Sequence, residues 1–164
     1  MDINNIKIIL ASDHAGFALK ETVKSFLQTK GYSVLDVGAH VLVPEDDYPP
    51  YMIAAAMKVA ADMKGETKAI LFGKSGQGEA MVANRFPGVR AAVWYGETTT
   101  ARVGLTKDGI LKLSREHNDA NVLSIGADFV TEEEAKKGIE LWLTTPFSGE
   151  EKHQRRIGQM DNIE

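Results

Sequence analysis

Short apolar runs alternate with amphipathic stretches along most of the chain. The runs are rich in isoleucine, leucine, valine and alanine and carry few charges. Such runs are typical of strands that are buried on both faces of a parallel sheet. The pattern predicts five strands, at residues 6–11, 32–37, 69–72, 89–94 and 120–125.

Between these runs, apolar side chains recur at helical spacing. After the first strand they fall at i, i+4, i+7 and i+8, which predicts a helix that ends near Lys30 and is capped by Gly31. Residues 98–113 are interpreted as a helix broken by a loop, and residues 114–119 as a polar segment. Further helices are predicted at 51–63, from 79 to about 84, and over a charged tail at about 149–163.

The helix after the fifth strand has the clearest signals. Residues 131–134 read Thr-Glu-Glu-Glu, which is a capping box that begins a helix, and Pro146 ends it. Four apolar residues at helical spacing form its predicted buried stripe: Ala135, Ile139, Trp142 and Leu143.

Strands that alternate with helices indicate a parallel sheet covered by helices on both faces. The predicted fold is therefore a Rossmann-like three-layer α/β/α architecture with a five-stranded parallel sheet and a C-terminal tail helix. Residues 1–164 are predicted to form a single domain, which suits a chain of this length. In such sheets, ligands bind outside the carboxyl ends of the strands.

Residues 68–85 read as a strand, a glycine loop and the start of a helix. Gly73, Gly76 and Gly78 keep the loop free of bulky side chains, while Ser75 supplies a hydroxyl and Glu79 a carboxylate. A glycine loop at the start of a helix leaves backbone N–H groups free to bind an anion. Amides of this kind beside a base suit a reaction that builds an oxyanion.

The same loop lacks three familiar motifs. The phosphate-binding P-loop and the nucleophile elbow require glycine at positions occupied by Lys68 and Gln77, and G-x-G-x-x-G fails at Met81. A plain structural turn between strand and helix remains the alternative interpretation of the loop. Asp13 and His14 follow the first strand, so they are expected to meet the glycine loop at the carboxyl edge of the sheet.

Composition narrows the range of functions. The net charge of −4 provides no basic surface for nucleic acid, and the absence of cysteine excludes disulfides and thiolate chemistry. No apolar run approaches the length of a membrane span, and the polar N-terminus is unlike a signal peptide, so a cytoplasmic protein is expected. The four histidines show no metal-ligand spacing, and neither metal nor cofactor is implied.

Five motifs stand out along the chain: Ser-Asp-His-Ala-Gly at 12–16, Asp-Tyr-Pro at 47–49, the glycine loop at 73–79, Ser-Arg-Glu-His-Asn-Asp-Ala-Asn at 114–121 and His-Gln-Arg-Arg at 153–156. In this order and spacing they resemble the family of ribose-5-phosphate isomerase type B and galactose-6-phosphate isomerase, from about residue 6 to residue 157. The resemblance implies a cytoplasmic enzyme of the pentose phosphate pathway that interconverts ribose 5-phosphate and ribulose 5-phosphate through a cis-enediolate.

The resemblance implies the catalytic roles. Many family members have a cysteine where this chain has Ser75, and one subgroup resembles this chain in having serine there and glutamate four residues later. Glu79 is therefore expected to be the base, although its carboxylate also favours the helix dipole. Ser75 and the amides of Gly76 and Gly78 would hold the oxyanion. His117 would open the sugar ring.

The remaining implied roles concern the substrate. Asp13 would share ring opening or orient hydroxyls, and Tyr48 would line the pocket or simply pack on Pro49. Asn118 would bind sugar hydroxyls. The phosphate would contact His14 and Arg156, with Lys152 assisting; a solvated tail is the alternative explanation of the charges at 155–156.

The resemblance also implies a homodimer, or a dimer of dimers, in which the segment of His117 and Asn118 reaches the site of the neighbouring subunit. The chain departs from the family pattern in an insertion at 103–113 and in Asp128, which replaces an arginine that relatives aim at phosphate. Asp128 either turns toward Arg155 or Lys152 or faces the pocket. Two alternatives therefore stay open: an isomerase of a different aldose or aldose phosphate, and a non-catalytic sugar-phosphate-binding subunit of a hetero-oligomer.

Overall fold

The computed structural model describes residues 6–96 and 109–162, which contain a five-stranded, fully parallel sheet. The strand order is β2-β1-β3-β5-β4, and each neighbouring pair runs in the same direction. The predicted strands are confirmed, with shifts of a few residues at their ends. They are β1 (Lys7–Ser12), β2 (Ser33–Asp36), β3 (Thr67–Gly73), β4 (Ala91–Trp94) and β5 (Val122–Gly126).

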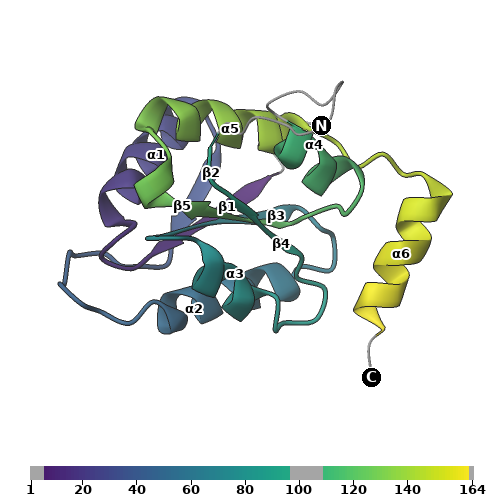
Figure 1. Ribbon diagram of the computed structural model, residues 1–164, viewed down its shortest axis with the longest axis horizontal. Coiled ribbons are helices and arrows are strands. Elements are labelled where there is room, and N and C mark those ends of the chain that lie inside the picture. Colours follow the sequence, from purple (N-terminus) through teal and green to yellow (C-terminus); the bar gives the residue numbers. More distant parts are fainter. Residues whose placement is uncertain (1–5, 97–108, 163–164) are drawn as a thin grey trace.

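Helices cover both faces of the sheet, as predicted. Helices α1, α4 and α5 lie on one face and α2 and α3 on the other, whereas α6 projects away from the layers (Figure 1). The helices are α1 (Phe17–Thr29), α2 (Pro49–Ala60), α3 (Gln77–Ala83), α4 (Gly109–Glu116), α5 (Glu132–Thr144) and α6 (Glu151–Asp161), with a short 3₁₀ helix η2 (Ala127–Phe129) after β5.

The core has two halves, one on each side of the sheet. Along β1, Ile8 and Leu10 pack toward α1 and α5, while Ile9 and Ala11 pack toward α2. Successive side chains of a strand point to opposite faces, so a strand covered on both sides is mostly apolar along its whole length. The capping box at Thr131 is present, and all four residues of the predicted stripe of α5 are buried.

One segment differs from what its polar sequence suggests. Residues 114–119 were interpreted only as a polar segment, but α4 continues to Glu116 and Arg115 is only 2% exposed. The guanidinium of Arg115 donates to the carbonyls of Thr145 and Ala120 and pairs with Asp119 at 2.7 Å, so tertiary contacts satisfy its buried charge. Only residues 109–113 of the helix expected at 98–113 lie within the described residues, and they begin α4.

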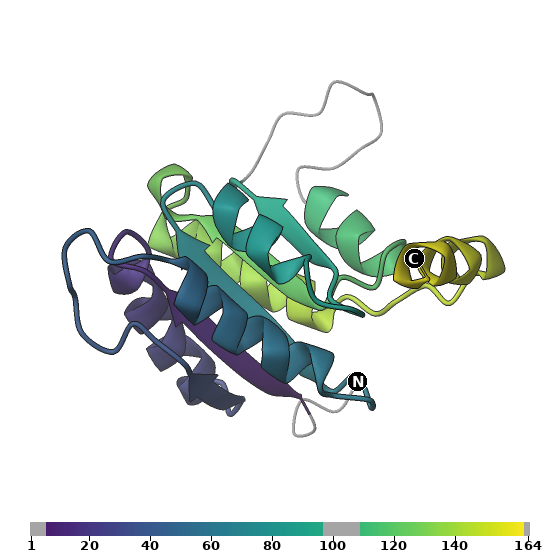
Figure 2. The ribbon, with the colours of Figure 1, turned by 90° about the horizontal axis from the view of Figure 1, so that it is seen from below.

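Because all strands run in the same direction, the sheet has a carboxyl edge and an amino edge. The segments that follow β1, β2, β3 and β5 lie at the carboxyl edge, whereas the turn between α4 and β5 and the whole of α6 lie at the amino edge (Figures 1 and 2). Within residues 6–96 and 109–162, no helix is both long and apolar enough to cross a membrane.

Candidate active site

The loops that follow β1 and β3 meet at the carboxyl edge. These neighbouring strands lead to helices on opposite faces (Figure 1), and the position outside the carboxyl ends of two such strands is where parallel sheets bind ligands; this position is called the crevice below. The approach is close: a Cβ on Gly16 would lie 2.3 Å from the carbonyl oxygen of Phe72. The predicted meeting of the Asp13 segment with the glycine loop is therefore confirmed.

Glu79 lies in the first turn of α3 and is buried, with 4% of its surface exposed. Its side chain folds back over Gly73, because a Cβ placed on that glycine would lie 1.7 Å from Glu79 Oε1. Burial raises the pKa of the Glu79 carboxyl, and the charge of Asp13 raises it further against the opposing pull of a backbone N–H. A raised pKa makes this carboxylate a stronger base than an exposed one.

Asp13 is buried beside Glu79 and shapes the start of α1. Its Oδ1 accepts hydrogen bonds from the backbone N–H groups of Ala15 at 3.0 Å and Gly16 at 3.1 Å. Its Oδ2 has no hydrogen-bond partner among the residues that the structure describes. Asp13 therefore has one oxygen fixed by the turn and one left to accept a hydrogen bond from a ligand.

The glycine loop has the geometry of an anion cradle. Gly76 caps α3 with φ of 74°, a left-handed conformation that favours glycine, and Ser124 Oγ donates to its carbonyl at 2.7 Å. Within the described part of the chain, the N–H groups of Gly76 and Gly78 donate to no protein group. Ser75 Oγ lies next to them and accepts from Gln77 N at 3.4 Å. Two free amides and a hydroxyl are thus gathered within one turn.

Tyr48 reaches the same loop from the start of α2. A Cβ on Gly78 would lie 2.6 Å from the Tyr48 hydroxyl oxygen, so the phenol lies directly over the first turn of α3. The ring also packs against the apolar cluster under α2. The ring therefore packs against this cluster while the hydroxyl lies against the glycine loop, and both the lining of the pocket and the packing on Pro49 stay predictions.

Four of the predicted site residues lie at the amino edge. His117 and Asn118 follow α4, and Lys152 and Arg156 lie on α6; all four side chains are exposed. The His117 ring packs on the buried His153 ring, with centroids 4.1 Å apart. The turn after α4 and helix α6 lie at the amino edge, whereas the start of α3, which carries Glu79, lies at the carboxyl edge (Figures 1 and 2), so a single chain does not bring all the predicted residues together.

Asp128 lies exposed in η2, which follows β5 at the carboxyl edge. It makes no ion pair with any residue in the described ranges, and its expected turn toward Arg155 or Lys152 does not occur within one chain. Lys152 pairs instead with Glu150 at 2.7 Å. Asp128 is thus an exposed negative charge at the carboxyl edge with no ion-pair partner among residues 6–96 and 109–162.

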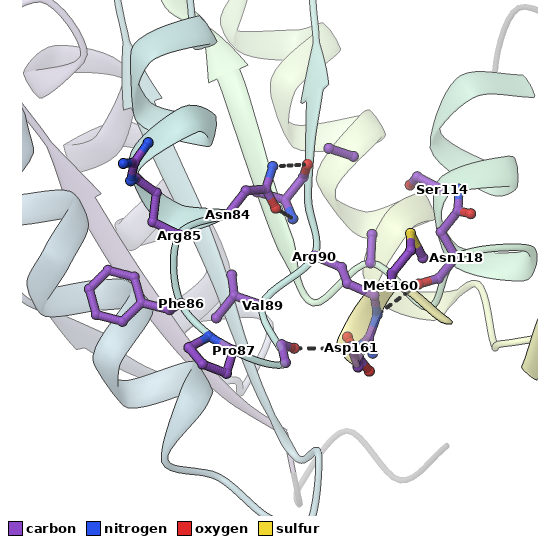
Figure 3. Close-up of a pocket in the computed structure, with 14 residues that line it drawn as sticks. Asn84, Arg85, Phe86, Pro87, Val89, Arg90, Ser114, Asn118, Met160 and Asp161 are labelled. Carbon is purple, nitrogen blue, oxygen red and sulfur yellow. Dashed lines mark hydrogen bonds and ion pairs between the residues drawn. The ribbon is translucent and has the colours of Figure 1, made fainter. Parts of the chain in front are cut away.

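A cavity of about 700 Å³ opens at the amino edge between the loop after α3, the end of α4 and the end of α6 (Figure 3). Phe86, Val89 and Met160 give it apolar walls. Arg90 crosses it and pairs with Asp161 at 3.3 Å. The cavity borders Asn118. It lies at the amino edge, whereas Glu79 lies at the carboxyl edge, so the cavity is separate from the crevice described above.

Sequence reasoning missed two groups near the site. Asp46, one position before the Asp-Tyr-Pro motif, binds both the backbone and the ring of His14; its only signal was its place in an acidic loop. His153, which supports the His117 ring, was seen only as part of the His-Gln-Arg-Arg motif. No group of three or more acidic, histidine or cysteine side chains in the described ranges could hold a metal ion.

Comparison with known proteins identifies the family to which the chain is similar and several related proteins. The model of a family described as Ribose/Galactose Isomerase matches residues 8–160. The ribose-5-phosphate isomerase B of Mycolicibacterium paratuberculosis is 39% identical over 153 residues, which cover 93% of this chain and 87% of that protein. The probable ribose-5-phosphate isomerase B of Mycoplasma genitalium is 34% identical over 160 residues, covering 98% of this chain and 97% of the relative.

Solved structures show the same likeness. The crystal structure of ribose-5-phosphate isomerase B from Mycoplasma genitalium with bound ribulose-5-phosphate has a TM-score of 0.85 and 33% identity, and the match covers 96% of this chain and 95% of that one. The ribose 5-phosphate isomerase of Thermotoga maritima has a TM-score of 0.83 and 34% identity, covering 96% and 99% of the two chains.

Proposed function

Because the chain belongs to the ribose/galactose isomerase family, we propose that it is an aldose–ketose isomerase that interconverts ribose 5-phosphate and ribulose 5-phosphate. It would work in the cytoplasm as a single-domain subunit without a cofactor. The observation that carries the proposal is the buried Glu79 carboxylate with a raised pKa, placed beside Asp13 and the free amides of the glycine loop. This combination supplies a base and an oxyanion cradle within one crevice.

In the forward direction, Glu79 removes the proton from C2 of the open-chain aldose. The electrons of the C2–H bond form the C1=C2 double bond, and those of the aldehyde C=O move onto O1. The amides of Gly76 and Gly78, with the hydroxyl of Ser75, donate to the enediolate oxygens. The proton held by Glu79 then adds to C1, and transfer of the O2 proton to O1 completes the ketose. Asp13 and Tyr48 orient the hydroxyls beside the reacting carbons.

We further propose that the complete site forms between two copies of the chain. His117, Asn118, Lys152 and Arg156 lie at the opposite edge from Glu79 in one chain, yet the reaction needs a ring-opening acid–base group and cations for the phosphate. A two-fold axis that sets the amino edge of one copy against the carboxyl edge of the other completes two equal sites. The minimal active unit is then a homodimer, whether or not two dimers associate further.

The second candidate function concerns the substrate. Asp128 is an exposed carboxylate at the carboxyl edge, without an ion-pair partner in the described part of the chain, and it would repel a phosphate. This favours a different or less charged aldose, or a binding subunit that has lost activity. The presence of both Glu79 and Asp13 at one site argues for catalysis. The presence of His14 and Arg156 argues for a substrate with a phosphate. Ribose 5-phosphate therefore remains the proposed substrate, bound with a raised KM.

The test is Glu79→Gln, which keeps the shape of the side chain but removes the proton acceptor. We expect kcat with ribose 5-phosphate to fall by about 10²-fold or more, with little change in KM. Glu133→Gln, an equal charge change on the exposed face of α5, is the matched control and should keep wild-type kinetics. Near-normal turnover by Glu79→Gln would reject Glu79 as the base.

A mixing experiment tests the shared site. Glu79→Gln and His117→Ala chains should each be nearly inactive as homodimers. After mixing and subunit exchange, each heterodimer has one site with both native residues, so activity should recover to a substantial fraction of wild type. An active monomer in light scattering at assay concentration, or no recovery despite proven exchange, would contradict the arrangement.

A further inference from the structure

We propose that Asp46 is a positioning residue for His14, which it holds in one orientation and in its protonated form, so that His14 acts as a fixed cation for the phosphate of the substrate. This inference deepens the proposed function and rests on it for the identity of the anion. The contact between Asp46 and His14 is independent of that identity and can be tested without any turnover.

The geometry of the contact fixes the ring. Asp46 Oδ1 accepts the backbone N–H of His14 at 2.8 Å and lies 2.7 Å from His14 Nδ1. One carboxylate oxygen therefore binds a residue at two points, on the main chain and on the ring, which restricts rotation of the side chain. Asp46 is mostly buried, with 10% of its side chain exposed, whereas the imidazole is 37% exposed. The partner is thus sheltered while the ring stays open to a ligand.

The charges around His14 favour the protonated ring. The hydrogen bond from Asp46 is the largest influence and raises the pKa of His14; burial lowers it, and the charges of Asp13 and Asp46 raise it again. Desolvation opposes ionisation of Asp46, but hydrogen bonds from His14 and Tyr51 lower its pKa, so it stays a carboxylate that can only accept. Nδ1 therefore carries a proton, and Nε2 is the nitrogen available to the ligand.

Three elements bring these groups together. Asp13 and His14 follow β1, Asp46 lies in the loop after β2, and Tyr51 lies in α2. The beginning of the loop is also fixed, because Ser12 exchanges backbone hydrogen bonds of 2.7 Å with Gly38 and Ala39. A loop held at its base and again at Asp46 keeps the carboxylate against His14.

This chain has a specific need for such a cation. Of the three residues expected to contact phosphate, only His14 lies at the same edge as Glu79, since Lys152 and Arg156 lie on α6. Asp128 adds a negative charge to that edge. A histidine with a raised pKa keeps its proton to higher pH, and the proton strengthens binding of an anion because a charge-assisted hydrogen bond is stronger than a neutral one. Asp46 thereby compensates in part for the charge of Asp128.

Nuclear magnetic resonance titration of the histidine Cε1–H signals tests the contact directly. In the wild type, His14 should titrate above the ordinary histidine value of 6.5. In Asp46→Asn, which keeps an oxygen acceptor but removes the charge, it should titrate lower. Glu45→Gln, the same charge change on the exposed neighbouring residue, should leave the titration unchanged. A wild-type His14 at or below 6.5 overturns the proposal without any variant, and so does an identical titration in Asp46→Asn.

Kinetics and a phosphate titration test the consequence. For Asp46→Asn, KM for ribose 5-phosphate should rise by about fivefold to tenfold at pH 8.5 but by less than about twofold at pH 6, with kcat within about twofold. A fall in kcat with constant KM would overturn the positioning role. If the wild type does not turn over ribose 5-phosphate, the proposed function fails by itself. Inorganic phosphate should still shift the His14 signal at pH 8, and more weakly in Asp46→Asn; an equal shift in both would overturn the inference.

Discussion

Gly73→Ala should inactivate the protein by displacing Glu79 rather than by disturbing the backbone. Gly73 ends β3 outside the left-handed region, so alanine can adopt its conformation. The added Cβ, however, would lie 1.7 Å from Glu79 Oε1 and 2.2 Å from its carboxyl carbon, and contacts under 3.0 Å essentially never occur. The carboxylate therefore has to move by well over 1 Å.

The expected loss follows from this displacement. A misplacement of about 1 Å in a catalytic group can cost about 10²-fold, so kcat with ribose 5-phosphate should fall by about 10²-fold or more. Crowding of this kind destabilises a well-packed site by about 1–3 kcal/mol, which leaves the protein folded. Steady-state kinetics should be measured together with thermal unfolding. Gly158→Ala is the matched control, because a Cβ there meets no atom within 4 Å.

A double mutant shows whether the effect acts through Glu79. If it does, Gly73→Ala combined with Glu79→Gln should be no less active than Glu79→Gln alone, because the base is already lost. If the fold-losses in kcat of the two single mutants multiply in the double mutant, the two changes act independently and this explanation is refuted. A kcat of Gly73→Ala within about threefold of wild type would refute the placement of the carboxylate over Gly73.

Two further predictions concern stability. The raised pKa of Glu79 means that its contribution to the free energy of unfolding is full below the ordinary glutamic acid value and is lost as the pH rises through the raised value. Glu79→Gln should therefore have a Tm about 2–4 °C above that of the wild type at pH 8 and nearly the same Tm as the wild type at pH 4. If variant and wild type have the same Tm at pH 8 as well, the prediction is contradicted. Arg115→Met should lower the free energy of unfolding by about 2–4 kcal/mol in urea titrations, since the carbonyls of Thr145 and Ala120 lose their donor. The exposed Arg85→Met is its control, and a loss no larger than that control would show that the buried contacts contribute little.

Local signals in the sequence determined most of the fold. Apolar runs identified the strands because a strand covered on both faces buries most of its side chains, as the alternating packing of Ile8 and Ile9 shows. The capping box at Thr131 and the helical spacing from Ala135 to Leu143 identified α5, because both depend only on neighbours within one or two turns. The meeting of Asp13 with Glu79 followed from the general rule for parallel sheets.

Tertiary structure alone decided the remainder. Arg115 looks like a surface residue in the sequence, and only the carbonyls of distant segments allow its burial. The contact between Asp46 and His14 joins residues 32 positions apart, and no periodic pattern records it. His117 and Glu79 lie at opposite edges of the sheet. His117 precedes β5 and Glu79 follows β3, and these two strands are parallel neighbours. The periodicity of apolar residues determines which face of each helix or strand is buried, whereas the strand order determines which distant side chains meet.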